Sequence, residues 1–190
     1  MHVAPFGSYL PRFVPVLAVT CAALLLTAPV AVAEPGCASA SSAPTEAEGD
    51  TLEQATLCLL NAQRARRGLR PLRLSPKLAR SAALHAGDME RRNYFSHSSL
   101  SGASFVDRIR ETGYLRGVRR WSLAENIGWG IGSRSTPRSV VEAWMDSPGH
   151  RAIILNRSYD DVGIGLATGA PIRRRGSRAA TYVTDFGARG

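Results

Sequence analysis

The chain has 190 residues, of which 44% are hydrophobic and 21% are charged, and its formal net charge is +9. This length favours a single domain and the composition is ordinary for a globular fold, so neither points to a disordered or multidomain chain. Arginine supplies almost all of the positive charge, because Lys77 is the only lysine. A basic surface attracts anionic partners such as cell-wall polymers, lipid headgroups or nucleic acid, but it does not select among them.

Residues 1–33 predict an export signal. A long apolar run ends in Ala31–Ala33, which has the small-x-small pattern of a signal-peptide cleavage site. The alternative is an uncleaved N-terminal membrane anchor, since the run is nearly long enough to span a bilayer. Pro15 and Pro29 count against that alternative. We therefore expect a secreted, extracellular protein that is cleaved after the apolar run.

Two cysteines, Cys37 and Cys58, follow the expected cleavage site. An even number of cysteines in an oxidising compartment favours a disulfide between them. The alternative is a buried thiol at Cys58 and a free one at Cys37. Residues 34–49 are rich in Ala, Ser, Pro and Glu, which predicts a flexible lead-in to a folded domain at 50–190.

Helical signals dominate the first part of the domain. Four helices are expected, with starts near Asp50, Pro76, Ser104 and Thr136, and the fourth should end before Pro148. In the second helix, Leu78, Ala82, His85 and Met89 share one face at helical spacing. A lone histidine on such a face favours a hydrogen-bonded core residue over a ligand.

Strand signals concentrate late in the chain. Segments 161–168 and 181–188 predict a hairpin, and 126–132 is a candidate third strand. Helices followed by strands indicate an α+β fold with an antiparallel sheet. The expected hairpin tip carries four arginines, Arg173, Arg174, Arg175 and Arg178. Such a run is typical of a solvated turn, and its alternative role is to contact an anionic surface.

Several familiar catalytic motifs are absent: the His-Glu-x-x-His zinc helix, the phosphate loop ending in Gly-Lys and the Gly-x-Ser-x-Gly elbow. Two histidines, His97 and His150, instead lie among Ser, Gly and Pro at breaks in helical segments, and Glu125 lies between them in sequence. Loops on a rigid scaffold are where functional sites concentrate. The alternative is that each histidine only caps local backbone.

Five segments stand out along the chain: LLNAQRARRGLRPLRLSPKLARSAALHAGDM, NYFSHSS, AENIGWG, VVEAWMDSPGHRAIILN and TYVTDFG. Together, in this order, they resemble the bacterial, secreted branch of the CAP superfamily. That superfamily comprises cysteine-rich secretory proteins, antigen 5 and pathogenesis-related proteins. The resemblance runs from about Leu52 to Gly187. It implies a three-layer α-β-α sandwich around a central antiparallel sheet.

The resemblance also implies a cleft formed by His97, Glu125 and His150. Ser147 stands where the family has a second acidic residue, so this cleft has three of the four family groups. Two neutral imidazoles could bind zinc weakly, with Glu125 either as a third ligand or as a group that orients an imidazole. A histidine and Glu125 could instead form an acid–base pair.

Family members are linked to lipid or sterol binding, defence and cell-wall processes. We therefore expect an exported protein that binds a lipid, sterol or cell-wall ligand. The sequence favours a binding protein over an enzyme. The alternative is a metal-assisted extracellular hydrolase or protease. No specific nucleic acid partner is expected. Because one fold hosts many functions, the resemblance alone does not select between binding and catalysis.

Overall fold

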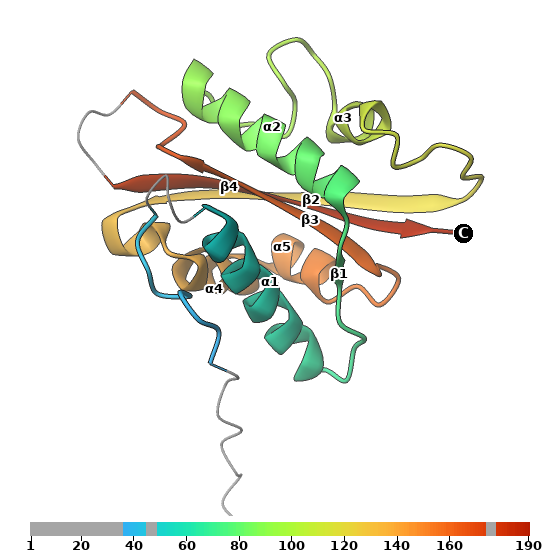
Figure 1. Cartoon of the computed structure of the whole chain (residues 1–190), viewed down its shortest axis with the longest axis horizontal. Coiled ribbons are helices and arrows are strands. Elements are labelled where there is room, and N and C mark those ends of the chain that lie inside the picture. The colour runs from blue at the N-terminus through green and yellow to red at the C-terminus, as the bar shows by residue number, and fades with distance from the viewer. Residues whose placement is uncertain (1–35, 45–48, 174–177) are drawn as a thin grey trace, which may run out of the picture. The chain divides into compact units, whose positions relative to one another are not determined.

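A computed structural model describes residues 36–44, 49–173 and 178–190 (Figure 1). The expected signal peptide at 1–33 lies outside the described residues, as do Arg174 and Arg175 of the basic hairpin tip. Within the described ranges, every helix is too short or too polar to span a membrane.

Three layers make up the fold (Figure 1). The elements in chain order are α1 (Gly49–Ala65), β1 (Arg73–Leu74), α2 (Pro76–Arg92), α3 (Phe105–Glu111), β2 (Trp121–Ile131), the 3-10 turn η2 (Gly132–Ser135), α4 (Pro137–Asp146), α5 (Pro148–Ile154), β3 (Asp161–Thr168) and β4 (Ala179–Arg189). Helices α2 and α3 cover one face of the sheet, and α1, α4 and α5 cover the other. The expected α-β-α sandwich is therefore confirmed.

The sheet has the strand order β1-β3-β4-β2. β3 pairs with β4 and β4 pairs with β2, both antiparallel, which confirms the expected hairpin and the third strand. The two-residue strand β1 pairs parallel with β3, so the sheet is mixed rather than wholly antiparallel. This short strand follows α1 through a loop and leads directly into α2, so it fixes where α2 begins over the sheet.

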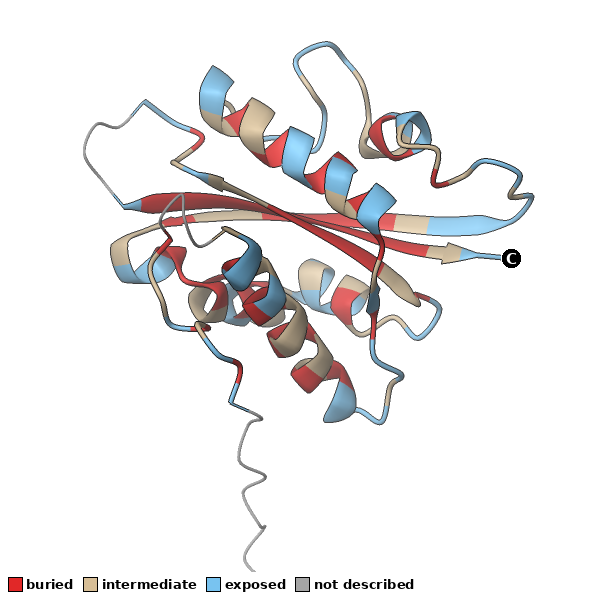
Figure 2. Ribbon diagram, viewed as in Figure 1, coloured by how far each residue is buried: buried red, intermediate tan, exposed pale blue. Residues whose placement is uncertain are grey.

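Helix α2 lies very close to β3. A Cβ atom at Gly163 would overlap the backbone at Leu78, and one at Gly165 would overlap the backbone at Ala83. The two glycines alternate along β3 and so point to the same face of the sheet. The inner face of α2 is buried against this surface at Leu78, Ala82, His85 and Met89, as the sequence predicted. Figure 2 shows the same inward burial on both helical layers.

A disulfide joins Cys37 to Cys58, as expected from the cysteine count. It ties the segment 36–44 to α1, and the Arg138 backbone N–H donates to the Ala40 carbonyl at 2.8 Å. Cys37 is 8% exposed and Ala40 is 2% exposed, and both belong to the main core cluster. Residues 36–44 are thus packed, whereas the sequence predicted a flexible lead-in, because the disulfide brings two small side chains into the core.

The helical part of the chain continues past Pro148. The fourth helix, α4, ends at Asp146, before this proline, as the sequence predicted, but Pro148 then occupies the first position of a further helix, α5, that the sequence did not predict. A proline is tolerated there because the first helical N–H groups have no partner within the helix. His150 therefore lies in the first turn of α5 and not in a loop.

Candidate functional site

His97 and Glu125 are in direct contact. His97 lies in the segment between α2 and α3, Glu125 lies in β2, and the distance from His97 Nδ1 to Glu125 Oε1 is 2.8 Å. The imidazole is 53% exposed, whereas the carboxylate side chain is only 1% exposed. Because a carboxylate can only accept, Nδ1 donates this bond, and Nε2 of the neutral ring keeps its lone pair. This nitrogen is the one available to a ligand or a proton.

The segment that carries His97 is fixed from below by a buried histidine. Helix α2 ends at Asn93, which adopts a left-handed conformation with φ of 55° and turns the chain back. His85 Nε2 then donates to the Ser96 carbonyl at 2.8 Å. Burial, followed by the nearby Arg108 charge, lowers the pKa of His85. The ring is therefore a neutral, hydrogen-bonded core residue, the role expected from its place on the apolar face.

Arg108 of α3 holds both members of the His97–Glu125 pair. Its Nη2 donates to Glu125 Oε2 at 2.6 Å. Its Nη1 donates to the His97 carbonyl at 3.0 Å, to Ser99 Oγ at 3.2 Å and to the Ala103 carbonyl at 3.2 Å. The Arg108 side chain is 9% exposed, so this is a buried ion pair with additional backbone contacts. It fixes the carboxylate and the histidine segment relative to each other.

A second carboxyl group lies beside Glu125. Asp185 of β4 is the cross-strand partner of Glu125 and is fully buried. Burial, and then the negative charge of Glu125, raise the pKa of Asp185 well above its usual value. The nearby Ser81 hydroxyl and Arg108 oppose this effect without cancelling it. Burial and the neighbouring carboxyl group therefore favour the protonated form of Asp185.

His150 completes the group from the opposite layer. Asn126 of β2 donates to the His150 carbonyl at 3.3 Å, which connects the first turn of α5 to the sheet. Burial, and then the charge of His97, lower the pKa of His150. His150 Nδ1 is buried without a hydrogen-bond partner. Of the residues predicted from the sequence, His97 and Glu125 are in contact, whereas His150 is related to them by the electrostatic influence of His97.

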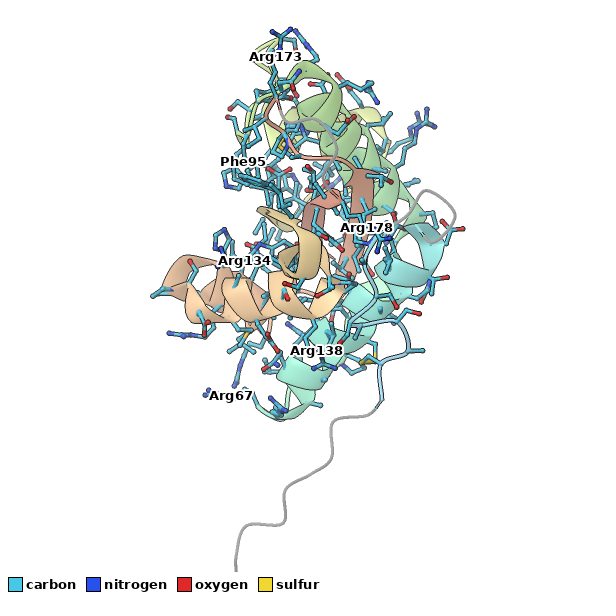
Figure 3. The ribbon with its side chains drawn as sticks, turned by 90° about the vertical axis from the view of Figure 1, so that its left-hand side faces the viewer. Arg67, Phe95, Arg134, Arg138, Arg173 and Arg178 are labelled. Carbon is cyan, nitrogen blue, oxygen red and sulfur yellow. A yellow bond between two sulfur atoms is a disulfide. The ribbon has the colours of Figure 1, made fainter. Side chains whose placement is uncertain are left out.

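A cavity of about 370 Å³ opens beside His150. Seven of its lining residues are apolar, aromatic or glycine: Phe95, Ile127, Gly128, Trp129, Val140, Ala143 and Trp144. Four are polar: Arg134, Ser139, Ser147 and His150. Figure 3 shows Phe95 and Arg134 on the same side of the molecule. Trp144 Nε1 donates to the Ile127 carbonyl at 3.0 Å, which fixes the floor.

Ser147 lines this cavity and is the residue that precedes the first turn of α5. Its backbone is the N-cap of α5, but its side chain makes no capping hydrogen bond. The family resemblance in the sequence implies that Ser147 stands at the position of the second acidic residue of the family cleft. A hydroxyl there leaves the cavity uncharged at a point where a carboxylate would make it acidic.

A metal centre with His97, His150 and Glu125 as three ligands does not fit the contacts of the carboxylate. Each oxygen of Glu125 already accepts a hydrogen bond, one from His97 and one from Arg108. Across the described ranges, no group of three His, Cys, Asp or Glu side chains is arranged to hold a metal ion. Catalytic zinc sites usually have three protein ligands. The contacts of Glu125 are those of a group that orients an imidazole.

Sequence reasoning missed three members of this region: Arg108, Asp185 and Phe95. Arg108 sits on the inner face of a short helix, where an arginine is indistinguishable from its solvated neighbours. Asp185 is an acidic residue within a β-rich run, and a charge at a buried strand position is a signal that could have identified it. Phe95 immediately precedes the His97 segment and is exposed, so no periodicity marks it.

Comparisons with known proteins agree with the fold. The protein YkwD of Bacillus subtilis is 35% identical over 132 residues, which cover 70% of this chain and 48% of YkwD. The B. subtilis membrane protein YlbC is 35% identical over 116 residues, which cover 61% of this chain and 32% of YlbC. The chain thus spans about half of one relative and a third of the other.

Among solved structures, an extracellular Bacillus anthracis protein containing an SCP domain matches with a TM-score of 0.60 and 26% identity, over 73% of this chain and 40% of that one. An outer surface protein of Borrelia burgdorferi matches with a TM-score of 0.55 and 22% identity, over 69% of this chain and 87% of that one. The sequence profile of the cysteine-rich secretory protein (CAP) family matches residues 57–184. The chain belongs to the cysteine-rich secretory protein family.

Proposed function

We propose that this chain is an exported protein that binds a lipid-like ligand in the cavity beside His150. Among the lipid, sterol and cell-wall ligands that the family suggests, the lining favours one with an apolar body and a polar or anionic end. The observation that carries this proposal is that one cavity combines aromatic walls with a guanidinium group, Arg134, and an imidazole, His150. Ligand sites are commonly apolar clefts of this size with a few placed polar groups.

Two properties of the cavity support binding of such a ligand, its apolar surface and its polar groups. Apolar ligand surface that leaves water contributes about 25 cal/mol per Å² buried. Phe95, Trp129 and Trp144 offer that surface. The Arg134 guanidinium can then hold a carboxylate or phosphate end of the ligand by paired hydrogen bonds. His150 remains neutral at neutral pH because burial and His97 lower its pKa, so it adds a hydrogen-bonding group without adding charge.

The export part of the proposal rests on the apolar run at 1–33 and its small-x-small end. The disulfide between Cys37 and Cys58 supports an oxidising compartment. The extracellular B. anthracis structure supports the same location. The N-terminal anchor is the alternative, and the two are distinguished by whether the mature protein from the culture medium begins at Glu34.

An extracellular hydrolase is the second candidate, and the His97–Glu125 pair is the observation that favours it, although the contacts of Glu125 disfavour the metal-assisted form expected from the sequence. A carboxylate that orients the imidazole leaves Nε2 as a general base, the geometry that many hydrolases use. Yet in the described parts of the chain neither His97 nor His150 hydrogen bonds to a serine, threonine or cysteine side chain that could act as a nucleophile. Binding therefore remains the better-supported function.

The proposal is tested by displacement of a fluorescent fatty acid from the mature protein. Ala143 lines the cavity from α4, so Ala143→Phe should fill it and weaken uptake at least tenfold. Ala152→Phe is the matched control, because Ala152 is exposed on α5 and does not line the cavity. Equal uptake by the two variants, or no saturable uptake by the unmodified protein, would contradict lipid binding. If the unmodified protein released a hydrolysed product and the His97→Ala variant did not, the result would instead favour the hydrolase.

A further inference from the structure

A second cavity of about 480 Å³ lies between α2, α3 and the segment 99–103. It shares no lining residue with the cavity beside His150. Six of its lining side chains are charged at neutral pH: Arg80, Arg91, Arg92 and Arg108, with Asp88 and Glu111. The four guanidinium groups outnumber the two carboxylates, so the cavity attracts anions.

Two of these arginines have no carboxylate partner among the ion pairs of the described residues. Asp88 Oδ1 lies 3.6 Å from Arg92, and Arg108 is paired with Glu125. Arg80 and Arg91 have no carboxylate partner in the ion pairs of the described ranges. They are 11 residues apart on α2, which is about three full helical turns, so both lie on one side of the helix and line the same cavity.

A glycine makes room for one of the two. A Cβ atom at Gly87 would lie 2.7 Å from Arg91 Nη1, so the Arg91 guanidinium folds back over the space that a side chain would fill. Glycine in the interior of a helix lowers helix stability relative to alanine. Its presence here lets the Arg91 guanidinium lie along the helix beside the cavity rather than extend into solvent.

The floor of the cavity offers both kinds of hydrogen-bonding atom. Arg108 Nε is a buried donor without a partner, and His85 Nδ1 is buried without a partner as well. His85 Nε2 carries the ring proton, since it donates to the Ser96 carbonyl. Because burial lowers the pKa of His85, the ring is neutral and Nδ1 is an acceptor. Ser99 and Ser101 add hydroxyl groups to the wall.

We propose that this cavity binds a small hydroxylated anion, either a sugar acid or a sugar phosphate. Arg80 and Arg91 hold the anionic group by charge-assisted hydrogen bonds. A ligand hydroxyl both donates and accepts, so it suits the serines and the paired donor and acceptor of the floor. The volume is in the range of ordinary small-molecule sites. The site does not depend on the lipid-binding proposal, because the two cavities have separate linings.

The test is calorimetric titration of the mature protein with glucuronate, glucose 6-phosphate, glucose and inorganic phosphate. We expect saturable binding of at least one of the two sugar anions, and at least tenfold weaker binding of glucose and of inorganic phosphate. Whichever sugar anion binds more tightly identifies the anionic group. Absence of binding for both sugar anions overturns the proposal, as does glucose or inorganic phosphate binding as tightly as they do.

Two variants locate the site. Arg80→Gln should weaken binding of the sugar anion at least tenfold, whereas Arg119→Gln, an exposed arginine outside the cavity, should leave it unchanged. Gly87→Ala displaces the Arg91 guanidinium while favouring the helix, so it should weaken binding without lowering the thermal midpoint. Equal affinities in Arg80→Gln, Arg119→Gln and the unmodified protein would overturn the assignment to this cavity.

Discussion

Glu125 and Asp185 face each other across β2 and β4, and both carboxyl groups are buried. Two buried carboxylates on paired strand positions repel each other when both are ionised, which favours a proton on one of them. Arg108 forms an ion pair with Glu125, whereas burial and the Glu125 charge raise the pKa of Asp185, so we assign the proton to Asp185. The carboxylate that contacts His97 therefore has Arg108 and Asp185 as its two charged or acidic neighbours.

Asp185→Asn tests this assignment, because asparagine resembles a protonated aspartic acid and cannot ionise. The pKa of Asp185 is raised in the folded protein, so the unfolded chain releases its proton above about pH 3.9 while the folded chain retains it. Stability is then lost as pH rises from that value to the folded pKa. The variant does not suffer this loss and should melt at least about 2 °C higher at pH 7.5, the effect of about 1 kcal/mol in a domain of this size.

The measurement is thermal unfolding of both proteins at pH 4.5 and pH 7.5. The advantage of Asp185→Asn should grow with pH, and Asp146→Asn, at an exposed position of α4, should show no such growth. A variant that is less stable than the unmodified protein at both pH values would mean that Asp185 is ionised and needed as a charge.

Glu125→Gln should behave in the opposite way to Asp185→Asn. Removing this charge leaves the Arg108 guanidinium buried without its ion-pair partner. Breaking a buried pair by removing one partner costs about 3–5 kcal/mol. Urea unfolding at pH 7 measures the loss, and a decrease below about 1 kcal/mol would show that Arg108 does not depend on Glu125.

The contrast between Arg108 and His97 shows which residues of the site could be predicted from the sequence and which could not. His97, Glu125 and His150 could be named because short, ordered motifs around them resemble a known family. Arg108 and Asp185 carry the electrostatics of the site, yet their roles come from strand register and from the placement of a seven-residue helix over β2. Register and helix placement are tertiary facts that periodicity does not contain, so these two residues emerged only from the structure.

The same limit applies to the fold. The buried face of α2 and the β3–β4 hairpin followed from periods of 3.6 and 2, which depend only on local geometry. The helix α5 was missed because Pro148 can either end a helix or begin one, and the choice depends on packing beyond the sequence window. The packed segment 36–44 was missed because its burial depends on a covalent link to a residue on another element.

Gly163→Ala should show how tightly α2 constrains the sheet. The new methyl group would overlap the α2 backbone at Leu78, which cannot move as a flexible side chain would. Overpacking of this kind costs about 1–3 kcal/mol and occasionally more, and we expect the upper end. Gly149→Ala is the matched control, because nothing lies within 4 Å of its Cβ position in α5. Chemical denaturation of both variants gives the comparison, and equal stabilities would mean that α2 can move away from β3.

His97→Ala should raise the pKa of His150. Two causes lower that pKa, first burial and then the positive charge of protonated His97. Removing the second cause leaves the first, so the pKa should rise without reaching the ordinary value of about 6.5. NMR titration of the His150 ring protons measures it, with Ser98→Ala as the control because Ser98 is an exposed neighbour of His97. If His150 titrates identically in all three proteins, the two imidazoles do not share a site, and no reaction or ligand can be assigned to them jointly.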